Sequence, residues 1–260
     1  MGQYQSSRYN NMLYEDFRLL IADHAKRRDV PQGDCSGNAD SPWDINLRFV
    51  LSEETYTVRS VAAGDETALQ KFGASMGDNA RDMFCPYPWN DSNACMSAFS
   101  RAVTNSVNKV DASYLLFCGA APIGHFFLWK ANNNSVSTSA GLSIPELGIA
   151  IVDSFAGHGL GALAVRMLLA VATQLGADAV ELTTATTNEA GRRAYSRAGF
   201  TDTGLIQIPL DVDVTAVESG EVVGSRFRSE RQMVYIINKA KRPAVLSFLS
   251  SKRAQTTAGA

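Results

Sequence analysis

The sequence predicts a mixed α/β domain with additional segments at both ends. Hydrophobic residues make up 45% of the 260 residues and charged residues 19%, a balance typical of soluble globular proteins. From about residue 55 to residue 238, short apolar segments typical of strands alternate with segments of helical periodicity. One strand continues through a glycine-rich turn into a long apolar helix, which is typical of an α/β domain.

The composition argues against several classes of protein, namely nucleic-acid-binding, membrane and zinc proteins. The net charge is -2, so no broad basic field favours nucleic acid. No apolar run reaches the ~18 residues that cross a bilayer, and the start of the chain does not resemble a signal peptide. The four scattered cysteines predict reduced thiols, and the three histidines have no zinc-like spacing. We therefore expect a cytoplasmic protein with no metal site, no membrane segment and no nucleic-acid partner.

Both ends of the chain are expected to lie outside the main domain. Residues 1–54 predict an N-terminal extension, with a helix from Met12 to Ala25 because apolar residues recur there at helical spacing. The segment 30–44, VPQGDCSGNADSPWD, is rich in turn residues and predicts a loop. The tail 239–260 is basic, is interrupted by a proline, and is expected to be partly disordered.

The main domain is expected to span residues 55–238. Its first strand is YTVRSV (56–61), and Asp65 is a candidate cap for the helix that follows. Two strands joined by a tight turn are predicted at 114–119 and 123–129. The later elements are expected in the order strand 146–152, helix from 160, strand 179–184, helix 187–199, strand 200–210 and strand 231–237.

The helix that follows strand 146–152 has the clearest pattern. Apolar residues from Leu160 to Leu175 recur at i, i+3, i+4 and i+7 spacing. Three glycines lie where this helix begins, namely Gly157, Gly159 and Gly161. Glycines let backbone N–H groups approach a ligand closely, and a helix N-terminus attracts negative charge. The turn is therefore a candidate pyrophosphate site, although a turn that only packs the helix on the sheet would also use glycines.

Two ligand classes fit this turn. Gly159 to Ala164 matches the dinucleotide fingerprint G-x-G-x-x-G/A, and Glu181 lies about 20 residues further on, where an acid would bind ribose. However, Glu181 falls early in its strand, and the strands before the turn predict a hairpin rather than β–α–β alternation. An NAD-dependent oxidoreductase therefore remains the weaker alternative.

The helix at 187–199 presents three hydrogen-bonding side chains on one face. At about 100° per residue, Asn188, Arg192 and Tyr195 fall within about 60° of one another. An amide, a guanidinium and a phenol can all bind a polar ligand. A solvated helix with an incidental tyrosine is the simpler alternative.

Taken together, these segments resemble the GNAT superfamily of acetyl-CoA-dependent N-acyltransferases. The resemblance rests on ELGIAI, on FAGHGLGALAVRMLL and, after a further strand, on NEAGRRAYSRAGF. It is clearest over 146–204, extends in order over 56–238, and does not cover the two ends. It implies a mixed, mostly antiparallel sheet that is flanked by helices and splayed open where the cofactor enters.

The resemblance also implies the cofactor contacts. The co-substrate would be acetyl-CoA or another acyl-CoA, and the family's loop Arg/Gln-x-x-Gly-x-Gly/Ala maps onto residues 156–161. Ala156 departs from this pattern, so one charge-assisted phosphate contact is missing, for which His158 is a candidate replacement. The implied contacts are Ile149, Ala150, Ile151, Gly157, His158, Gly159, Leu160, Gly161, Ala162, Asn188 and Arg192.

The same resemblance assigns catalytic candidates. Tyr195 matches a tyrosine that often protonates the departing CoA thiolate. Glu146 is the leading general base, because family members often place a carboxylate on this strand, but an offset of one residue would turn its side chain away. His125 is a second candidate for the base, and a satisfied core histidine is the simpler interpretation.

In this family the acceptor site is shaped by the segment after the first helix and by the last hairpin. Here that segment is 83–91, which is aromatic and stiffened by prolines. The candidate substrate contacts are Phe84, Tyr87, Trp89 and Trp129, although core or lid packing would use the same aromatic side chains. The acidic stretch 210–213 in the last hairpin loop could attract a cationic amine.

We therefore expect an N-acetyltransferase that moves an acetyl group from acetyl-CoA to a primary amine of a small molecule, by direct attack in a ternary complex. No covalent nucleophile is expected, because Cys118 has no identified activating partner. Two alternatives remain open: an acetyltransferase of protein N-termini or lysines, and a module that binds acyl-CoA without turnover. A homodimer is compatible with the sequence.

Overall fold

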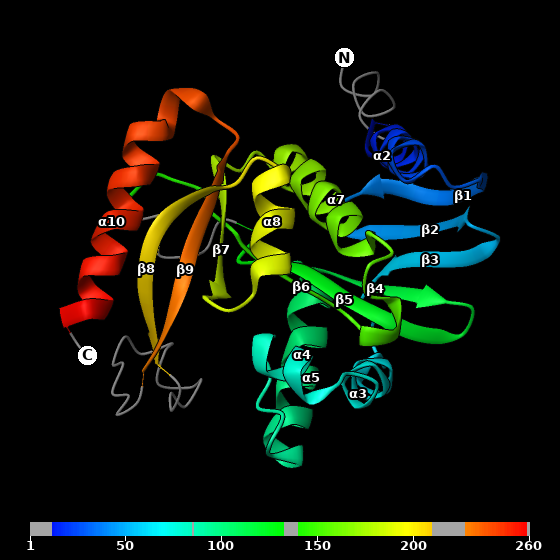
Figure 1. Cartoon of the computed structure of the whole chain (residues 1–260), viewed down its shortest axis with the longest axis horizontal. Helices are drawn as coiled ribbons and strands as arrows, with labels where there is room; N and C mark the ends of the chain where they lie inside the picture. The colour runs from blue at the N-terminus through cyan, green and yellow to red at the C-terminus, as the bar shows by residue number, and fades with distance from the viewer. Residues whose placement is uncertain (1–11, 85, 133–139, 210–226, 259–260) are drawn as a thin grey trace.

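The computed structural model describes residues 12–84, 86–132, 140–209 and 227–258. Over these residues, a nine-stranded sheet runs in the order β1-β2-β3-β4-β5-β6-β7-β9-β8 (Figure 1). The strands are β1 (Gln32–Ser41), β2 (Asp44–Leu51), β3 (Glu54–Ser60), β4 (Ala112–Cys118), β5 (Ala121–Trp129), β6 (Glu146–Ile151), β7 (Ala179–Ala185), β8 (Thr201–Pro209) and β9 (Phe227–Ile236). All neighbours pair antiparallel except β6 and β7, so the predicted fold class is confirmed.

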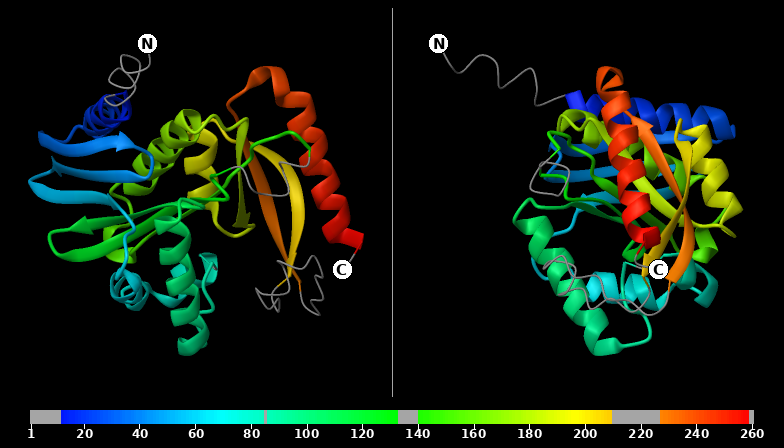
Figure 2. Two further views of the ribbon diagram at one scale, coloured as in Figure 1. Left: turned by 180° about the vertical axis from the view of Figure 1, so that it is seen from behind. Right: turned by 90° about the vertical axis from the view of Figure 1, so that its left-hand side faces the viewer.

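Helices cover both faces of this sheet. They are α2 (Met12–Arg28), α3 (Glu66–Ala74), α4 (Asp78–Met83), α5 (Ser92–Val107), α7 (Leu160–Gln174), α8 (Glu189–Arg197) and α10 (Arg242–Ala258), with short 3₁₀ turns η1 (Asp153–Phe155) and η2 (Lys239–Lys241). Figures 1 and 2 show α2 and α7 on one side of the sheet and α3, α4 and α5 on the other. None of the helices in the described ranges is both long and apolar enough to cross a lipid bilayer.

The sheet opens between β6 and β7. These two strands share one register pair, Glu146 opposite Glu181, whereas β6 pairs along its length with β5, and β7 pairs along its length with β9. Beyond Glu146, backbone groups on one side of β6 therefore have no strand partner, although strands normally pair such groups. The splayed centre implied by the resemblance is present, and it leaves polar backbone available to a ligand.

The N-terminal segment is part of the sheet rather than a helix followed by a loop. The helix predicted from Met12 to Ala25 is confirmed and extends to Arg28, but the loop predicted at 30–44 is wrong, since residues 32–41 form β1. Gly37 has a φ of 122°, and a Cβ there would lie 2.0 Å from the Asn46 carbonyl oxygen. The turn residues of β1 thus permit close pairing with the apolar strand β2, and this pairing overrides their low strand propensity.

The C-terminal tail is also ordered where it is described. The expected partial disorder is wrong for 242–258, which forms α10. Pro243 does not interrupt this helix because it lies in the first turn, where a missing N–H loses no helical hydrogen bond. Val245 and Leu249 are buried against the β7–β9 face, which anchors the helix to the sheet.

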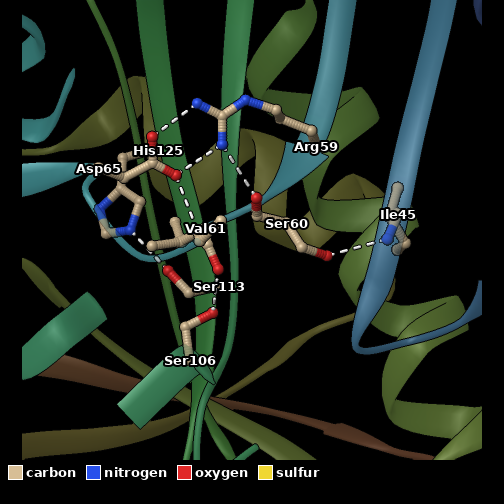
Figure 3. Close-up of polar contacts among 9 residues, drawn as sticks. Ile45, Arg59, Ser60, Val61, Asp65, Ser106, Ser113 and His125 are labelled. Atoms are coloured by element: carbon tan, nitrogen blue, oxygen red, sulfur yellow. Dashed lines mark hydrogen bonds and ion pairs between the residues drawn. The ribbon is translucent and has the colours of Figure 1, made fainter. Parts of the chain in front are cut away.

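Asp65 precedes α3 as predicted, but its side chain does not cap that helix. The carboxylate instead accepts hydrogen bonds from Arg59 Nη1 and Nη2 at 2.6 and 2.7 Å, and from the Ala62 N–H at 2.7 Å (Figure 3). This two-point ion pair fixes the connection from β3 to α3.

Candidate active site

A cavity of about 680 Å³ lies at the opening between β6 and β7. Its walls come from β6, the turn before α7, the first residues of α7, one face of α8 and the end of α4. Pockets for small ligands usually measure about 300–1,000 Å³. The cavity therefore has the size of a ligand site and lies where several of the predicted site segments meet.

The glycine-rich turn forms one wall of this cavity. Gly157 and Gly159 have φ angles of 79° and 74°, in the left-handed region that favours glycine, and Gly159 directly precedes α7. Gly161 is different, because it is not among the residues of positive φ and a Cβ added there would meet no atom within 4 Å. Open space therefore lies beside Gly161 at the N-terminus of α7, where unpaired N–H groups can bind phosphate. Neither backbone strain nor packing requires glycine at this position.

Most of the cofactor residues implied by the resemblance line the cavity. They are Ile149, Ala150, Ile151, Gly157, Gly159, Leu160, Gly161, Ala162 and Asn188. His158 and Arg192 are not among the lining residues. His158 Nδ1 lies 3.1 Å from the Ala156 carbonyl oxygen, and Arg192 Nη1 lies 3.4 Å from that of Thr186, so each side chain makes a local contact with a backbone carbonyl.

Asn188 is held as the N-cap of α8. Its Oδ1 accepts a hydrogen bond from the Gly191 N–H at 2.9 Å, and its Nδ2 donates to Thr184 Oγ1 at 3.0 Å. A capping side chain of this kind fixes the start of a helix. Asn188 therefore positions α8, and with it Tyr195, against the cavity.

Tyr195 lines the cavity from α8 and is flanked by Phe200, whose ring centre lies 6.0 Å away. Burial raises the pKa of its phenol to about 12. At neutral pH the hydroxyl therefore keeps its proton and can donate a hydrogen bond into the cavity.

Glu146 lines the same cavity, in a cluster of buried charges. Burial raises the pKa of its carboxyl group; the nearby carboxylates Glu181 and Glu230 raise it further, whereas Lys252 and Lys130 lower it. Lys252 reaches in from α10, and its Nζ lies 2.7 Å from Glu181 Oε1. Gln232 Nε2 donates to the other oxygen of Glu181 at 3.1 Å, and Glu230 is paired with Arg228.

The two catalytic candidates lie on opposite faces of the sheet. Glu146 is opposite Trp129 in the register of β5 and β6, and side chains opposite each other share a face, so Glu146 lies on the face of α3–α5. Tyr195 instead projects from α8, and the opening between β6 and β7 brings both into one cavity. The offset of one residue considered for Glu146 does not occur, because the glutamate lines the cavity.

The aromatic segment after α4 divides into two layers. Phe84 and Trp129 line the cavity, together with Phe127, whose ring centre lies 4.7 Å from that of Trp129. Tyr87 and Trp89 are not among the lining residues, and Trp89 Nε1 donates to the Phe84 carbonyl at 2.7 Å. Of the four predicted substrate contacts, two therefore face the cavity and two pack behind them. The acidic stretch 210–213 lies outside the described residues.

His125 lies outside the cavity and is fully buried beneath this aromatic layer. Its Nε2 is 2.9 Å from Ser113 Oγ, drawn in Figure 3, and its Nδ1 is 3.3 Å from the Tyr87 hydroxyl. Burial lowers its pKa to about 3, so the ring is neutral at physiological pH. With both nitrogens engaged, His125 matches the simpler interpretation of a core histidine.

Three basic side chains that line the cavity were not predicted from the sequence, namely Arg28 from α2, Arg197 from α8 and Arg228 from β9. Lys252 from α10 does not line the cavity, but it contacts Glu181 beside Glu146. Arg28 and Lys252 lie in segments that were expected to be outside the main domain, and no local pattern marks either one. Within the described residues, no group of three or more His, Cys, Asp or Glu side chains could hold a metal ion.

The comparisons with known proteins agree with this fold. The profile of the acetyltransferase (GNAT) domain matches residues 16–201, while no curated protein sequence matches the chain. Spermidine N-acetyltransferase from Vibrio cholerae, solved with CoA and spermine, is similar in fold, with a TM-score of 0.52 at 15% identity over 71% of this chain and 96% of that one. Mycobacterium smegmatis RimJ, solved with CoA-disulfide, has a TM-score of 0.51 at 14% identity over 85% and 95%.

A third similar structure is RimL, a ribosomal L7/L12 alpha-N-protein acetyltransferase, with a TM-score of 0.51 at 15% identity over 70% of this chain and 90% of that one. The dinucleotide alternative is wrong, because β6 pairs antiparallel with β5 and Glu181 is paired with Lys252 rather than open to a ribose. The profile match covers well over half of the 260 residues, and this chain belongs to the GNAT acetyltransferase family and is an acyltransferase.

Proposed function

We propose that this protein transfers an acetyl group from acetyl-CoA to a primary amine of a small molecule, in a ternary complex. The observation that carries the proposal is the meeting of three features in one cavity: the N-terminus of α7, the Tyr195 phenol and the Glu146 carboxylate. Each feature matches one requirement of the reaction, namely an anchor for phosphate, a hydrogen-bond donor for the leaving sulfur and an acceptor for the amine proton.

The residues present fit the co-substrate. The open space beside Gly161 would receive the pyrophosphate against the first N–H groups of α7. The unpaired edge of β6 at residues 149–151 would hydrogen-bond the amide groups of the pantetheine arm, much as a neighbouring strand would. When bound, acetyl-CoA supplies an acetyl group that is activated as a thioester.

Two side chains of the protein accept a proton and donate a hydrogen bond during the reaction. Glu146 accepts the proton that the amine nitrogen loses as the new C–N bond forms, and its raised pKa makes it a stronger base than an exposed glutamate. As the C–S bond breaks, the Tyr195 hydroxyl donates a hydrogen bond to the sulfur. A phenol of pKa about 12 does not readily give its proton to a thiolate, whose conjugate acid has a pKa of about 8.5. Tyr195 therefore stabilises the thiolate mainly as a donor, and the thiolate is protonated from solvent.

The acceptor end of the cavity favours a small amine. Phe84, Phe127 and Trp129 form an aromatic wall on the same face as Glu146, and such rings attract a cationic amine. Glu146 lines the cavity near these rings, and a carboxylate there favours the same ligand. Acetylation of a protein N-terminus or lysine remains the alternative for the same chemistry.

Thermal shift followed by an amine screen tests the proposal. At about 100 times the dissociation constant, a ligand stabilises the native state by about 2.7 kcal/mol, so CoA and acetyl-CoA should raise the melting temperature while NAD should not. Thiol release from acetyl-CoA is then measured with small polyamines, arylalkylamines and peptides with free N-termini. Faster release with peptides would favour the protein acceptor, and binding without release from any amine would favour a non-catalytic module.

A further inference from the structure

The phosphate-binding loop lacks the side chain that would carry positive charge. Ala156 stands where the family pattern has Arg or Gln, and His158, the candidate replacement, is turned toward the Ala156 carbonyl oxygen. Backbone N–H groups alone would then face the two charges of a pyrophosphate. The structure shows a cation at this loop from another part of the chain.

Arg28, at the C-terminal end of α2, lies against the glycine-rich turn. Its Nη1 donates to the Gly157 carbonyl oxygen at 2.7 Å, across 129 positions of sequence. A Cβ at Gly159 would lie 3.1 Å from the same Nη1 and 2.7 Å from His24 Cε1. The guanidinium thus lies at the first residues of α7, and Arg28 lines the cavity.

The charge of Arg28 is available to a ligand. Asp23, the acidic residue of α2 that is closest to Arg28 in the sequence, is paired with Arg27 and Arg166 instead. Among the described residues, Arg28 donates one hydrogen bond, to Gly157, although a guanidinium has five N–H donors. His24 adds no charge, since burial, helped by the positive charges of Arg166 and Arg28, lowers its pKa to about 4.

We propose that Arg28 binds the pyrophosphate of acyl-CoA and supplies the charge-assisted contact that Ala156 lacks. Helix α2 is then part of the co-substrate site. Its two C-terminal turns hold the glycine-rich turn through His24 and present the guanidinium beside the N-terminus of α7. This inference rests on the proposed function, because it assumes that acyl-CoA occupies the cavity.

The test compares Arg28→Gln with Arg27→Gln by isothermal titration with three ligands: CoA, 3′-dephospho-CoA and pantetheine. Arg27 is the matched control, since it is the adjacent residue, is also exposed, and does not line the cavity. We expect Arg28→Gln to weaken CoA and 3′-dephospho-CoA by about tenfold or more, because charge-assisted bonds to phosphate are lost. Pantetheine has no phosphate and should bind equally to both variants and the wild type.

Arg28→Lys keeps the charge without the planar guanidinium and should recover part of the lost affinity. Equal CoA affinity in wild type and Arg28→Gln would overturn the proposal, as would an equal loss for pantetheine, which would mean a structural role. A loss for CoA with none for 3′-dephospho-CoA would move the contact to the 3′-phosphate and would also refute the pyrophosphate assignment. If the wild type fails to bind CoA at all, the proposed function falls together with this inference.

Discussion

The proposed cofactor side and the proposed acceptor side of the cavity are built in different ways. The cofactor side comes mainly from one continuous stretch, β6 through the glycine-rich turn to α7, and it offers mostly backbone groups. On the acceptor side, Glu146 is surrounded by Trp129 from β5, Glu181 from β7, Glu230 from β9 and Lys252 from α10. Backbone geometry can be encoded locally, whereas a cluster of buried charges requires distant segments to pack together.

The difference has a physical cause. A helix N-terminus presents unpaired N–H groups wherever a helix begins, so a short glycine pattern is enough to specify the phosphate site. A buried carboxylate is costly unless partners compensate its charge, and those partners must come from neighbouring strands and helices. The cofactor side should therefore be broken by one local change, and the acceptor side should respond to changes far away in sequence.

The largest effect is expected at the turn. Gly159→Glu should weaken CoA binding by at least about 100-fold, because the residue has a φ of 74°, a side chain would meet His24 and Arg28, and its charge would repel phosphate. Gly176→Glu is the control, at the other end of α7, with a φ of 73° and open space around its Cβ. Isothermal titration with CoA should show normal binding for the control, and normal binding for both would refute the loop assignment.

Glu146→Gln should lower kcat by about 100-fold while leaving the affinity for acetyl-CoA within a factor of about two, since general bases contribute roughly 10²–10⁴-fold. Steady-state kinetics with the best amine of the screen and titration with acetyl-CoA measure the two effects. Wild-type turnover would remove Glu146 from the role of base.

Tyr195→Phe should reduce kcat by about tenfold, less than removal of the base, because a hydrogen bond to the developing thiolate is lost without a full proton transfer. Tyr235→Phe on β9 provides the control, since Tyr235 packs against Phe200 from another direction and is not among the residues that line the cavity. If both variants lose activity equally, packing rather than donation explains the role of Tyr195.

The smallest expected effect is a shift in the pH dependence of activity when the ion pair between Lys252 and Glu181 is broken. Activity should rise with pH as Glu146 loses its proton. Lys252→Met removes a cation that lowers the pKa of Glu146, so the acidic limb of the kcat profile should move to higher pH. Glu181→Gln removes a carboxylate that raises this pKa, so the limb should move to lower pH.

Both variants destroy the same ion pair, and a purely structural role would shift neither limb. Lys241→Met is the matched control, because Lys241 pairs with Asp178 at 3.0 Å and neither of these charges is among those that shift the pKa of Glu146. Movement of both limbs in one direction would mean that Lys252 and Glu181 do not act on Glu146 through their charges.

Much of the fold could be predicted because its signals are local. The hairpin of β4 and β5 and the helix α7 follow from strand alternation, turn residues and helical periodicity, and the strand–turn–helix order around the glycines identified the family. Strand β1 and helix α10 could not be predicted in this way. Their polar or basic sequences favour loops, and they are stabilised by pairing with β2 and by burial of Val245 and Leu249.

The same division applies to the site. Local sequence patterns located the glycine-rich turn, Asn188 and Tyr195 in and beside α8, and Glu146 on its strand, whereas Arg192 of the same predicted face does not line the cavity. The packing of distant segments was needed to show that His125 is a core residue and that Tyr87 and Trp89 pack behind the cavity wall. It was also needed to show that Arg28 lines the cavity from α2 and that Lys252 from α10 pairs with Glu181 beside Glu146. This is because backbone conformation depends on neighbours in sequence, whereas burial and charge depend on neighbours in space.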